Sequence, residues 1–308
     1  MITKEEITLS VSIITYNHEK FIRKAIDSVL NQKVDCKFEI IIGDDCSSDG
    51  TPAILQEYQE KHPEIVQLIL HPRRYKEIPG RTNNLTNLYA CRGKYIAMLD
   101  GDDYWISTDK LQRQIDFLEN NPDFNLCFHN AINFSEEDNF KSYLQSEKYK
   151  ILESRSVYDQ QFIASGSSVM PASSIVFRNN LDSELPEWFR EIFSADYALT
   201  LIVTSNGLAK YFKDIFSAYR RNEHNFSSKY KDTYGQFSNQ WKQILILEKQ
   251  FKNLDFSKRK GLICYNYSAI FSEKKSYWKM LLYMFNAIRY DKENFKNYFN
   301  HFNRFYLK

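Results

Sequence analysis

The sequence predicts an α/β protein: a doubly wound, mostly parallel β-sheet followed by a C-terminal helical extension. Before residue 135, short apolar runs alternate with helical segments about five times, as expected for a parallel sheet with helices on both faces. Three of these runs end in polar clusters, TYN, GDD and DGDD, and parallel sheets bind ligands beyond the carboxyl ends of their strands. After residue 228, repeated aromatic residues and lysines indicate helices.

Each element is predicted from a local pattern. Residues 8–15, TLSVSIIT, form a continuous apolar run typical of a buried strand. In residues 21–30 apolar side chains recur at helical spacing and form one stripe. Thr51 and Pro52 mark a helix start, and Asp109 precedes another. The expected strands before residue 135 are 8–15, 38–42, 65–70, 95–99 and 125–134, and the expected helices are 21–30, 51–62, 82–90 and 110–120.

The middle of the chain is less regular. Residues 135–156 are polar and weakly periodic, which indicates a mobile insertion near an acceptor. Strands are expected at 173–178 and 208–215, with a helix over 197–203 opened by Asp196.

Composition narrows the class of protein. The 308 residues are 43% hydrophobic and 26% charged, as in ordinary soluble globular proteins. The five cysteines form no CxxC pair, which predicts reduced thiols in a cytoplasmic protein and disfavours a zinc site. No targeting signal is visible, and the apolar stretch at 280–288 is too short to span a bilayer.

Charge is unevenly distributed. The formal net charge is +2, yet residues 228–308 carry +10 and the first 227 residues carry −8. One interpretation is that the acidic and basic parts of the chain bind different partners, and the other is that the basic residues form a solvated helical face. No nucleic acid partner is predicted, and a homo-oligomer is left open.

The acidic motif after the strand at 95–99 is the strongest chemical feature. Asp100, Asp102 and Asp103 repel one another unless a cation neutralises them, and their hard oxygen atoms favour Mg²⁺ or Mn²⁺. Such an ion can stabilise a departing diphosphate. A solvent-exposed acidic turn is the alternative, because a DxD sequence alone is common.

Further candidates follow the other strands. Asp44 and Asp45 close the second strand, where a carboxylate can accept a hydrogen bond from a base or a ribose; Asp44 fits a turn role equally well. Asp49 is interpreted as turn and cap chemistry. Neither GxGxxG nor GxxxxGK[ST] occurs, so a metal ion and cations such as Arg81 must hold any phosphate groups.

Three sequence blocks together resemble a known family. They are VSIITYNHEKFIRKAIDSVLNQ, EIIIGDDCSSDGT, and GKYIAMLDGDDYW with KLQRQIDFLENNPDF. Their order and spacing resemble the family 2 glycosyltransferases of bacteria, closely over residues 8–134 and more loosely to residue 227. The resemblance implies a GT-A fold in residues 1–227, with a nucleotide-binding part at about 1–134 and an acceptor part at about 135–227, before the tail at 228–308.

The resemblance also implies an activity and a set of roles. It indicates a metal-dependent, inverting enzyme that uses a nucleotide-sugar donor, such as a UDP-sugar, and a glycan acceptor in bacterial surface polysaccharide synthesis. Asp196 matches the general base. The implied nucleotide-binding residues are Thr15, Tyr16, Asn17, Asp45, Arg81, Asp100 and Asp102, and the implied metal-binding residues are Asp100, Asp102, Asp103 and His224.

Several of these residues have ordinary alternatives. Asp196 could only cap its helix, and Arg81 and His224 could be a surface arginine and a loop histidine. Trp105 could stack on an acceptor sugar or pack in the core. His18 and His129 are interpreted as structural.

Two other classes of protein compete with the glycosyltransferase interpretation. A nucleotidyltransferase usually has a basic glycine-rich loop after its first strand, where this chain has TYNHEKF. A non-catalytic carbohydrate-binding or scaffold protein would be expected to lack one of the acids, and all are present.

The basic tail suggests a location for the enzyme. Its aromatic residues include Trp241, Phe251, Trp278, Tyr283 and Phe285. Cations near an anionic leaflet and aromatic rings at the headgroups both favour a membrane surface. The hypothesis is peripheral contact with the inner face of an anionic membrane, beside a lipid-linked acceptor; a helical subdomain is the rival.

Overall fold

The computed structural model describes residues 7–73, 78, 80–134, 141–142, 155–166, 170–181, 184–220, 234–294, 296 and 298. The chain divides into two compact units. The first contains Met1–Asp159, Val169–Arg190 and Ile202–Asn222, and the second contains Gln160–Ser168, Glu191–Leu201 and Glu223–Lys308. The predicted boundary at 227 and almost all of the predicted insertion at 135–156 lie outside the described residues.

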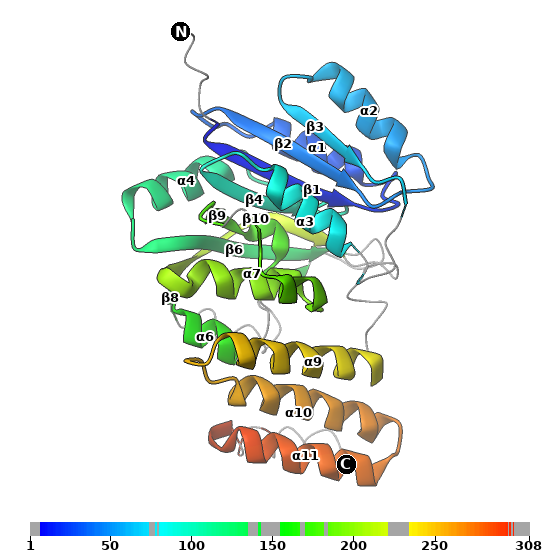
Figure 1. Cartoon of the computed structure of the whole chain (residues 1–308), viewed down its shortest axis with the longest axis vertical. Helices are drawn as coiled ribbons and strands as arrows, with labels where there is room; N and C mark the ends of the chain where they lie inside the picture. The colour runs from blue at the N-terminus through cyan, green and yellow to red at the C-terminus, as the bar shows by residue number, and fades with distance from the viewer. Residues whose placement is uncertain are drawn as a thin grey trace. The chain divides into compact units, whose positions relative to one another are not determined.

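One mixed β-sheet organises the first unit (Figure 1). The strand order is β3-β2-β1-β4-β9-β6-β10-β5, with β7 beside β6 and β8 beside β10. The strands are β1 Leu9–Thr15, β2 Phe38–Asp44, β3 Val66–Leu70, β4 Tyr95–Asp100, β5 Tyr104–Trp105, β6 Phe124–Phe134, β7 Lys141–Ser142, β8 Val157–Tyr158, β9 Val176–Arg178 and β10 Leu208–Arg220.

The predicted α/β class is confirmed, with differences in the second half of the sheet. The pairs β1–β2, β1–β4, β2–β3 and β6–β10 are parallel. Strand β9 instead runs antiparallel to both β4 and β6. The first two residues of the predicted strand at 173–178 belong to a 3₁₀ turn, Ala172–Ser174, that leads into β9. Strand β10 continues five residues beyond its predicted end at 215.

Alternation along the strands assigns the two faces of the sheet. Leu9, Val11 and Ile13 of β1 are completely buried in the main hydrophobic core. The same core takes the apolar sides of α1 Ile22–Leu30, α2 Thr51–Lys61 and α4 Lys110–Asn120. Because successive side chains of a strand point to opposite faces, Ser10 and Ser12 face the other way.

The opposite face is covered by α3 (Arg81–Ala90), which docks through asparagines. The Asn87 amide donates to the carbonyl oxygens of Ile13 at 2.7 Å and Ile41 at 3.1 Å, and the Asn83 amide donates to Gly43 O at 2.8 Å. Polar residues therefore form this helix–sheet contact, which explains why α3 has only a weak apolar stripe.

The second unit is largely helical. Its described helices are α6 Gln160–Ser165, α9 Tyr234–Gln250, α10 Ser257–Glu273, α11 Tyr277–Tyr290 and the turn Lys292–Asn294, and residues 195–201 of α7 Ala195–Val203 belong to it. Cys264, Met284, Ala287 and Tyr298 form a small core, with Trp241 and Tyr283 packed against it. These two aromatic residues of the tail are therefore packing residues.

Candidate active site

The polar clusters predicted at the strand ends meet where the strand order reverses. Strands β2 and β3 lie on one side of β1, and β4 lies on the other. Thr15, the last residue of β1, is in register with Asp44, and its neighbour Ile14 is in register with Asp100. Such a reversal opens a crevice beyond the carboxyl ends of the strands, where α/β sheets bind ligands. The first unit thus presents three loops at one edge.

The loops after β1 and β2 are joined by hydrogen bonds. The Asn17 backbone N donates to Ser47 Oγ at 2.8 Å, and the Ser48 backbone N donates to Asn17 Oδ1 at 2.8 Å. Both Asn17, with φ of 54°, and Cys46, with φ of 62°, have left-handed backbone conformations. Non-glycine residues adopt this conformation only where the surroundings enforce it, and such residues cluster at functional sites.

Asp44 belongs to this loop framework. One of its carboxylate oxygens accepts the Ser47 backbone N at 2.9 Å, and the other accepts the Ser47 hydroxyl. This is the turn role that the sequence left open for Asp44. Asp45 follows it, is only 3% exposed, and donates its backbone N to Thr15 O at 3.0 Å. The β2 end thus brings Asp45 directly beside the end of β1.

The acidic motif begins at the end of β4 and turns tightly. Gly101 N donates to Ile14 O at 2.9 Å, and Asp103 N donates to Asp100 O at 3.0 Å. A Cβ atom on Gly101 would lie 2.7 Å from Thr15 Oγ1 and 3.0 Å from His18 Nδ1. Glycine is therefore required between the acids, because the β1 loop packs directly against the motif.

Asp103 is held from behind by Arg220, the last residue of β10. Asp103 Oδ1 accepts the Arg220 backbone N at 2.8 Å, and Arg220 Nε donates to the Asp102 carbonyl oxygen at 3.0 Å. The Arg220 guanidinium also lies 4.2 Å from the centre of the Phe21 ring. Arg220 thus connects β10, the acidic motif and the segment that precedes α1.

Two side chains at this edge, Asp103 and His18, have shifted pKa values. Burial, followed by the charges of Asp102 and Asp100, holds the pKa of Asp103 well above its usual value. Burial also lowers the pKa of His18, although the carboxylates of Asp102, Asp49 and Asp44 oppose that shift. A cation bound beside these carboxylates would reduce their mutual repulsion and lower the pKa of Asp103.

The carboxylates fit a hard divalent cation. Asp103 Oδ2 is buried and has no hydrogen-bond partner among the described residues. Asp100 and Asp102 supply further oxygen atoms from the same turn, and carboxylate oxygens suit Mg²⁺ and Mn²⁺. Within the described part of the chain, no three His, Cys, Asp or Glu side chains are grouped as ligands of one ion. The described side chains alone therefore do not form a metal site, and the metal role of the motif stays a prediction.

Arg81 lies at the same edge by topology. It is the first residue of α3, the helix that leads from β3 back to β4, and such crossover helices begin near the carboxyl ends of the strands. The Arg81 guanidinium carbon lies 5.2 Å from the centre of the Phe189 ring, and the residue is 3% exposed. The surface-arginine alternative therefore does not fit.

Trp105 does not fit the role of an acceptor platform. It is 4% exposed and belongs to the main core. Its Nε1 donates to Ser173 O at 2.8 Å, and Lys110 Nζ lies 4.0 Å from its ring centre. A ring packed in this way has no face for an acceptor sugar, so the packing alternative is the one that fits the structure.

The proposed base belongs to the second unit, and the proposed histidine is outside the described residues. Asp196 is the second residue of α7, in the second unit, and its Oδ1 accepts the Ser194 hydroxyl. The capping alternative requires Asp196 to precede its helix. Because α7 begins at Ala195, Asp196 instead lies inside the first turn. His224 lies outside the described residues.

Two residues that the sequence analysis did not assign to the site lie against the acidic motif: His18, which it interpreted as structural, and Arg220. His18 Nδ1 lies 3.2 Å from Thr15 Oγ1 and faces Gly101. Its position one residue after TYN was the available signal. Arg220 had no local signal, because its contact with Asp103 joins residues 117 positions apart.

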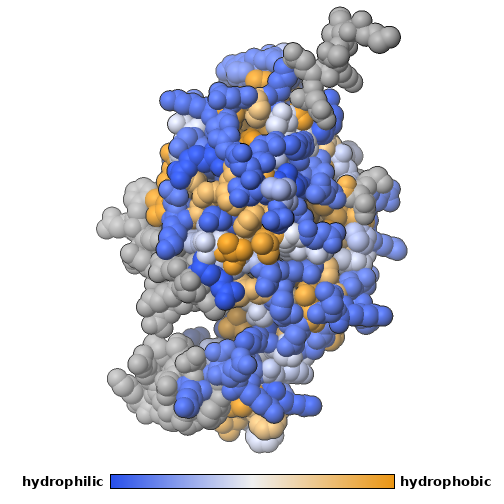
Figure 2. Space-filling model, turned by 90° about the vertical axis from the view of Figure 1, so that its left-hand side faces the viewer, coloured by the Kyte–Doolittle hydropathy of each residue, from blue (hydrophilic) through white to orange (hydrophobic). Residues whose placement is uncertain are grey.

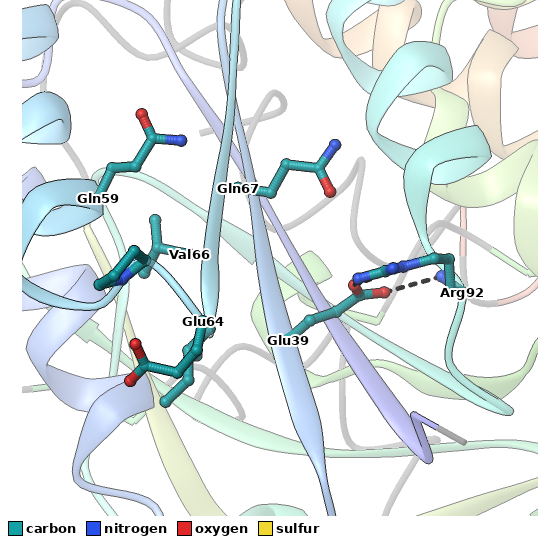
Figure 3. A pocket seen from close by; sticks show the side chains of 8 residues that line it. Glu39, Gln59, Glu64, Val66, Gln67 and Arg92 are labelled. Atoms are coloured by element: carbon teal, nitrogen blue, oxygen red, sulfur yellow. Dashed lines mark hydrogen bonds and ion pairs between the residues drawn. The ribbon is translucent and has the colours of Figure 1, made fainter. Parts of the chain in front are cut away.

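A separate cavity of about 240 Å³ lies at the opposite, amino-terminal edge of the sheet (Figure 3). Its lining includes Glu39, Glu64, Val66 and Arg92. Glu39 is the second residue of β2, about 16 Å along the strand from Asp44 at ~3.3 Å per residue. This cavity is therefore remote from the acidic motif.

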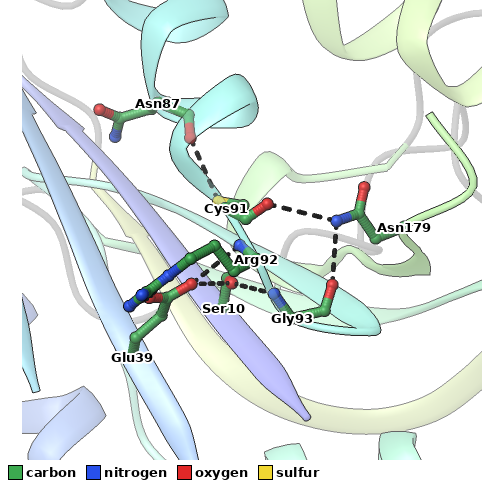
Figure 4. Close-up of polar contacts among 7 residues, drawn as sticks. All are labelled: Ser10, Glu39, Asn87, Cys91, Arg92, Gly93 and Asn179. Atoms are coloured by element: carbon green, nitrogen blue, oxygen red, sulfur yellow. Dashed lines mark hydrogen bonds and ion pairs between the residues drawn. The ribbon is translucent and has the colours of Figure 1, made fainter. Parts of the chain in front are cut away.

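Glu39 has a structural role at that edge (Figure 4). It is 3% exposed, and its carboxylate accepts Ser10 Oγ at 2.7 Å, Arg92 N at 2.9 Å and Arg92 Nε at 3.0 Å. Ser10 Oγ in turn accepts Gly93 N at 2.8 Å. Through Ser10 and Arg92 this buried carboxylate ties β1, β2 and the segment before β4 together, and chemistry at this position is not indicated.

Comparison with known proteins agrees with the arrangement at the carboxyl edge. Residues 10–185, more than half of the chain, match glycosyl transferase family 2. The chain belongs to this family.

Among curated relatives, the chain is 32% identical over 178 residues to an uncharacterized glycosyltransferase of Methanocaldococcus jannaschii, which covers 58% of this chain and 60% of that one. It is 34% identical over 111 residues, 36% of this chain and 41% of the relative, to the Escherichia coli protein named UDP-Glc:alpha-D-GlcNAc-diphosphoundecaprenol beta-1,3-glucosyltransferase WfaP. The chain is also 39% identical over 121 residues to an uncharacterized protein of Mycobacterium bovis. This match covers 39% of the chain and only about a third, 34%, of the mycobacterial protein.

Solved structures share the fold. TarS of S. aureus in complex with UDP-GlcNAc superposes with a TM-score of 0.57 at 16% identity, covering 97% of this chain and 92% of TarS. The mannosyltransferase PcManGT of Pyrobaculum calidifontis, in complex with GDP-Man and Mn²⁺, has a TM-score of 0.57 at 16% identity, covering 92% of this chain and 86% of PcManGT. The fold is therefore GT-A, as the sequence predicted.

Proposed function

We propose that this glycosyltransferase moves a sugar from a UDP-sugar to a hydroxyl group of a glycan, with inversion at the anomeric carbon and with Mn²⁺ or Mg²⁺ bound. The observation that carries the proposal is the packing of the acidic motif against the β1 loop. Gly101 contacts Thr15 and His18 there, and the ends of β1, β2 and β4 meet at one edge.

The nucleotide end of the donor has candidate partners at this edge. Asp45 would accept a hydrogen bond from the base, and Thr15, Tyr16 and Asn17 would contact the nucleoside, as the family resemblance implies. Asp100, Asp102 and Asp103 would hold the divalent ion, whose chemistry is to neutralise charge on the diphosphate. Arg81, buried beside Phe189, would contribute a second positive charge.

The transfer step needs a base for the acceptor. The acceptor oxygen attacks the anomeric carbon, its bond to that carbon forms while the bond to the diphosphate oxygen breaks, and the proton of the acceptor hydroxyl moves to the Asp196 carboxylate. The diphosphate leaves with the bonding electron pair. Asp196 belongs to the second unit, so this role rests on the family resemblance and not on a distance.

The acceptor class is proposed from the relatives. The name of WfaP specifies a sugar carried on diphosphoundecaprenol, and another relative, 39% identical over 110 residues, is named for teichuronic acid biosynthesis. We therefore propose a glycan of a bacterial surface polysaccharide, assembled on a lipid carrier, as the acceptor.

Calorimetry with UDP tests the donor and metal proposals together. UDP is expected to bind with Mn²⁺ present and to lose at least tenfold in affinity with EDTA, because the carboxylates alone repel a diphosphate. Asp102→Asn is expected to weaken the metal-dependent binding. The matched control is Asp109→Asn, which removes an exposed acid with 57% of its side chain accessible.

Two outcomes would contradict the proposal. Equal UDP affinity with Mn²⁺ and with EDTA would remove the metal role from the acidic motif. Tight binding of GDP but not UDP would assign a different donor. Incubation with the accepted nucleotide sugar, followed by NMR of the released or transferred sugar, then reports the anomeric configuration.

A further inference from the structure

Helix α11 (Tyr277–Tyr290) has one face packed within the helical unit and an apolar face on the surface. Met280, Met284 and Ala287 are buried. Large apolar residues occupy the opposite side with high exposed fractions: Tyr277 62%, Trp278 78%, Leu281 55%, Leu282 48% and Phe285 65%. Positions 278, 281, 282 and 285 follow the spacing of a single helix face. We call Trp278, Leu281, Leu282 and Phe285 the α11 face.

Apolar residues at this density are unusual for a surface helix. On the face drawn in Figure 2 the surface is mainly hydrophilic, and hydrophobic residues reach it in small groups. Scattered exposed apolar residues need no explanation, but a contiguous stripe usually marks an interaction site.

Cations surround the α11 face. Apart from Tyr277, the other exposed residues on α11 are Lys279 and Arg289, and the helix contains no acidic residue. Lys274 and Lys275 are exposed just before the helix, and Lys292 is exposed just after it.

Three acids lie beside the same stretch: Glu273, Asp291, which is 3% exposed, and Glu293, which pairs with Lys258 of α10 at 2.7 Å. The five cations outnumber these acids, and the apolar stripe therefore has a basic border.

The apolar stripe and the cations beside it together indicate which kind of partner the α11 face binds. An isologous contact with a second copy of the chain would bring the same basic border against itself, and like charges would repel. An anionic lipid surface instead neutralises the cations and accepts the apolar side chains at the headgroup level, where tryptophan is favoured. Binding in the plane of the surface suits α11, since no helix among the described residues is long and apolar enough to cross a bilayer.

We propose that the α11 face binds the surface of an anionic membrane, with Trp278 and Phe285 inserted among the headgroups and Lys279 and Arg289 contacting lipid phosphates. The proposal concerns the second unit and does not depend on the donor or metal assignments. Of the aromatic residues in the tail, only those of the α11 face are assigned to the membrane, because Trp241 and Tyr283 pack against the small core.

The full chain can be tested by sedimentation with vesicles. It should pellet with vesicles of phosphatidylcholine and phosphatidylglycerol at low salt, bind at least tenfold less to pure phosphatidylcholine, and be released at high salt. The double variant Trp278→Gln, Phe285→Gln should lose at least tenfold in partitioning to the anionic vesicles. Leu245→Gln, at a surface leucine of α9 that is 43% exposed, is the control and should bind as the wild type does.

A charge variant separates lipid binding from self-association. Lys279→Glu with Arg289→Glu should weaken vesicle binding and leave the sedimentation velocity of the free protein unchanged. Three results would overturn the proposal: no pelleting of the wild type with anionic vesicles, unchanged pelleting of the Trp278 and Phe285 variant, or a stable dimer that the same variant dissociates. The dimer would assign the α11 face to a second copy. Far-ultraviolet circular dichroism and thermal melting, measured in parallel, show whether each variant is folded, and they do not depend on the proposed donor.

Discussion

Lys110 is a buried cation in the core beneath the site. It is completely buried, its Nζ has no hydrogen-bond partner among the described residues, and it lies 4.0 Å from the centre of the Trp105 ring. Burial lowers the pKa of Lys110 from 10.5 to about 7, with a small opposing effect from Cys127. In the unfolded chain the group keeps its ordinary pKa, so the unfolded state binds more protons between pH 7 and 10.5.

This difference predicts how stability varies with pH. The contribution of Lys110 to the free energy of unfolding should rise from pH 7 to 10.5 and be least favourable below pH 7. Lys110→Met should therefore stabilise the protein at pH 6 by about 2–4 kcal/mol, with a gain that shrinks towards pH 10. Urea unfolding at several pH values measures this gain.

Lys213→Met is the control, because Lys213 is exposed and should change stability little. Destabilisation by Lys110→Met at every pH would mean that the attraction between the ammonium group and Trp105 exceeds the penalty of burial.

Asp196 is the residue on which the transfer step depends. A base acts only in the transition state, so Asp196→Asn should lower kcat by about 10²–10⁴ while leaving the Kd for UDP unchanged. Steady-state transfer assays and calorimetry measure the two quantities. Glu191→Gln, at an acid of the same unit with 62% of its side chain exposed, should keep wild-type kcat. A near wild-type rate for the Asp196 variant would exclude it as the base.

At the scale of elements, the contact between α3 and the sheet has almost no spare room. A Cβ on Gly43 would lie 2.0 Å from Asn83 Oδ1 and 2.4 Å from Asn87 Oδ1. Gly43→Ala should therefore push α3 away from β2 and destabilise the protein by about 1–3 kcal/mol. Chemical denaturation tests this expectation.

The matched variant for that test is Gly166→Ala, where the nearest atom would be 3.4 Å from the new Cβ. It should be close to neutral. Equal effects of the two variants would show that the asparagine contacts yield easily and do not fix the position of α3.

At the scale of the whole molecule, donor binding and stability are linked. UDP at about 100 times its Kd, with Mn²⁺, should raise the free energy of unfolding of the unit that binds it by about 2.7 kcal/mol. The ends of β1, β2 and β4 belong to the first unit. Hydrogen exchange should therefore slow in the peptides over residues 15–18, 44–49 and 100–103.

The second unit provides the internal comparison. Peptides from α10 and α11 should show unchanged exchange when UDP and Mn²⁺ are added, since these helices contain none of the proposed nucleotide ligands. Protection confined to α10 and α11 would place the nucleotide in the second unit and contradict the proposed site.

The sequence by itself determined the α/β class, the first four parallel strands and the acidic motif at the end of β4. These features follow from local patterns: continuous apolar runs for strands buried on both faces, helical spacing between them, and polar residues at strand ends. Asp45, Asp100 and Thr15 could be placed at one edge because parallel strands share the direction of their carboxyl ends.

Only the tertiary structure decided which side chains face that edge and which are buried. Trp105 follows the acidic motif directly, yet it packs in the core under Lys110. Arg220 lies 117 residues from Asp103 and contacts it only because β10 joins the sheet beside β5. In the tail, Trp241 and Trp278 have similar local sequences of aromatic and basic residues, but helix packing partly buries the first and leaves 78% of the second exposed. Such differences depend on contacts between distant segments, and no local pattern encodes them.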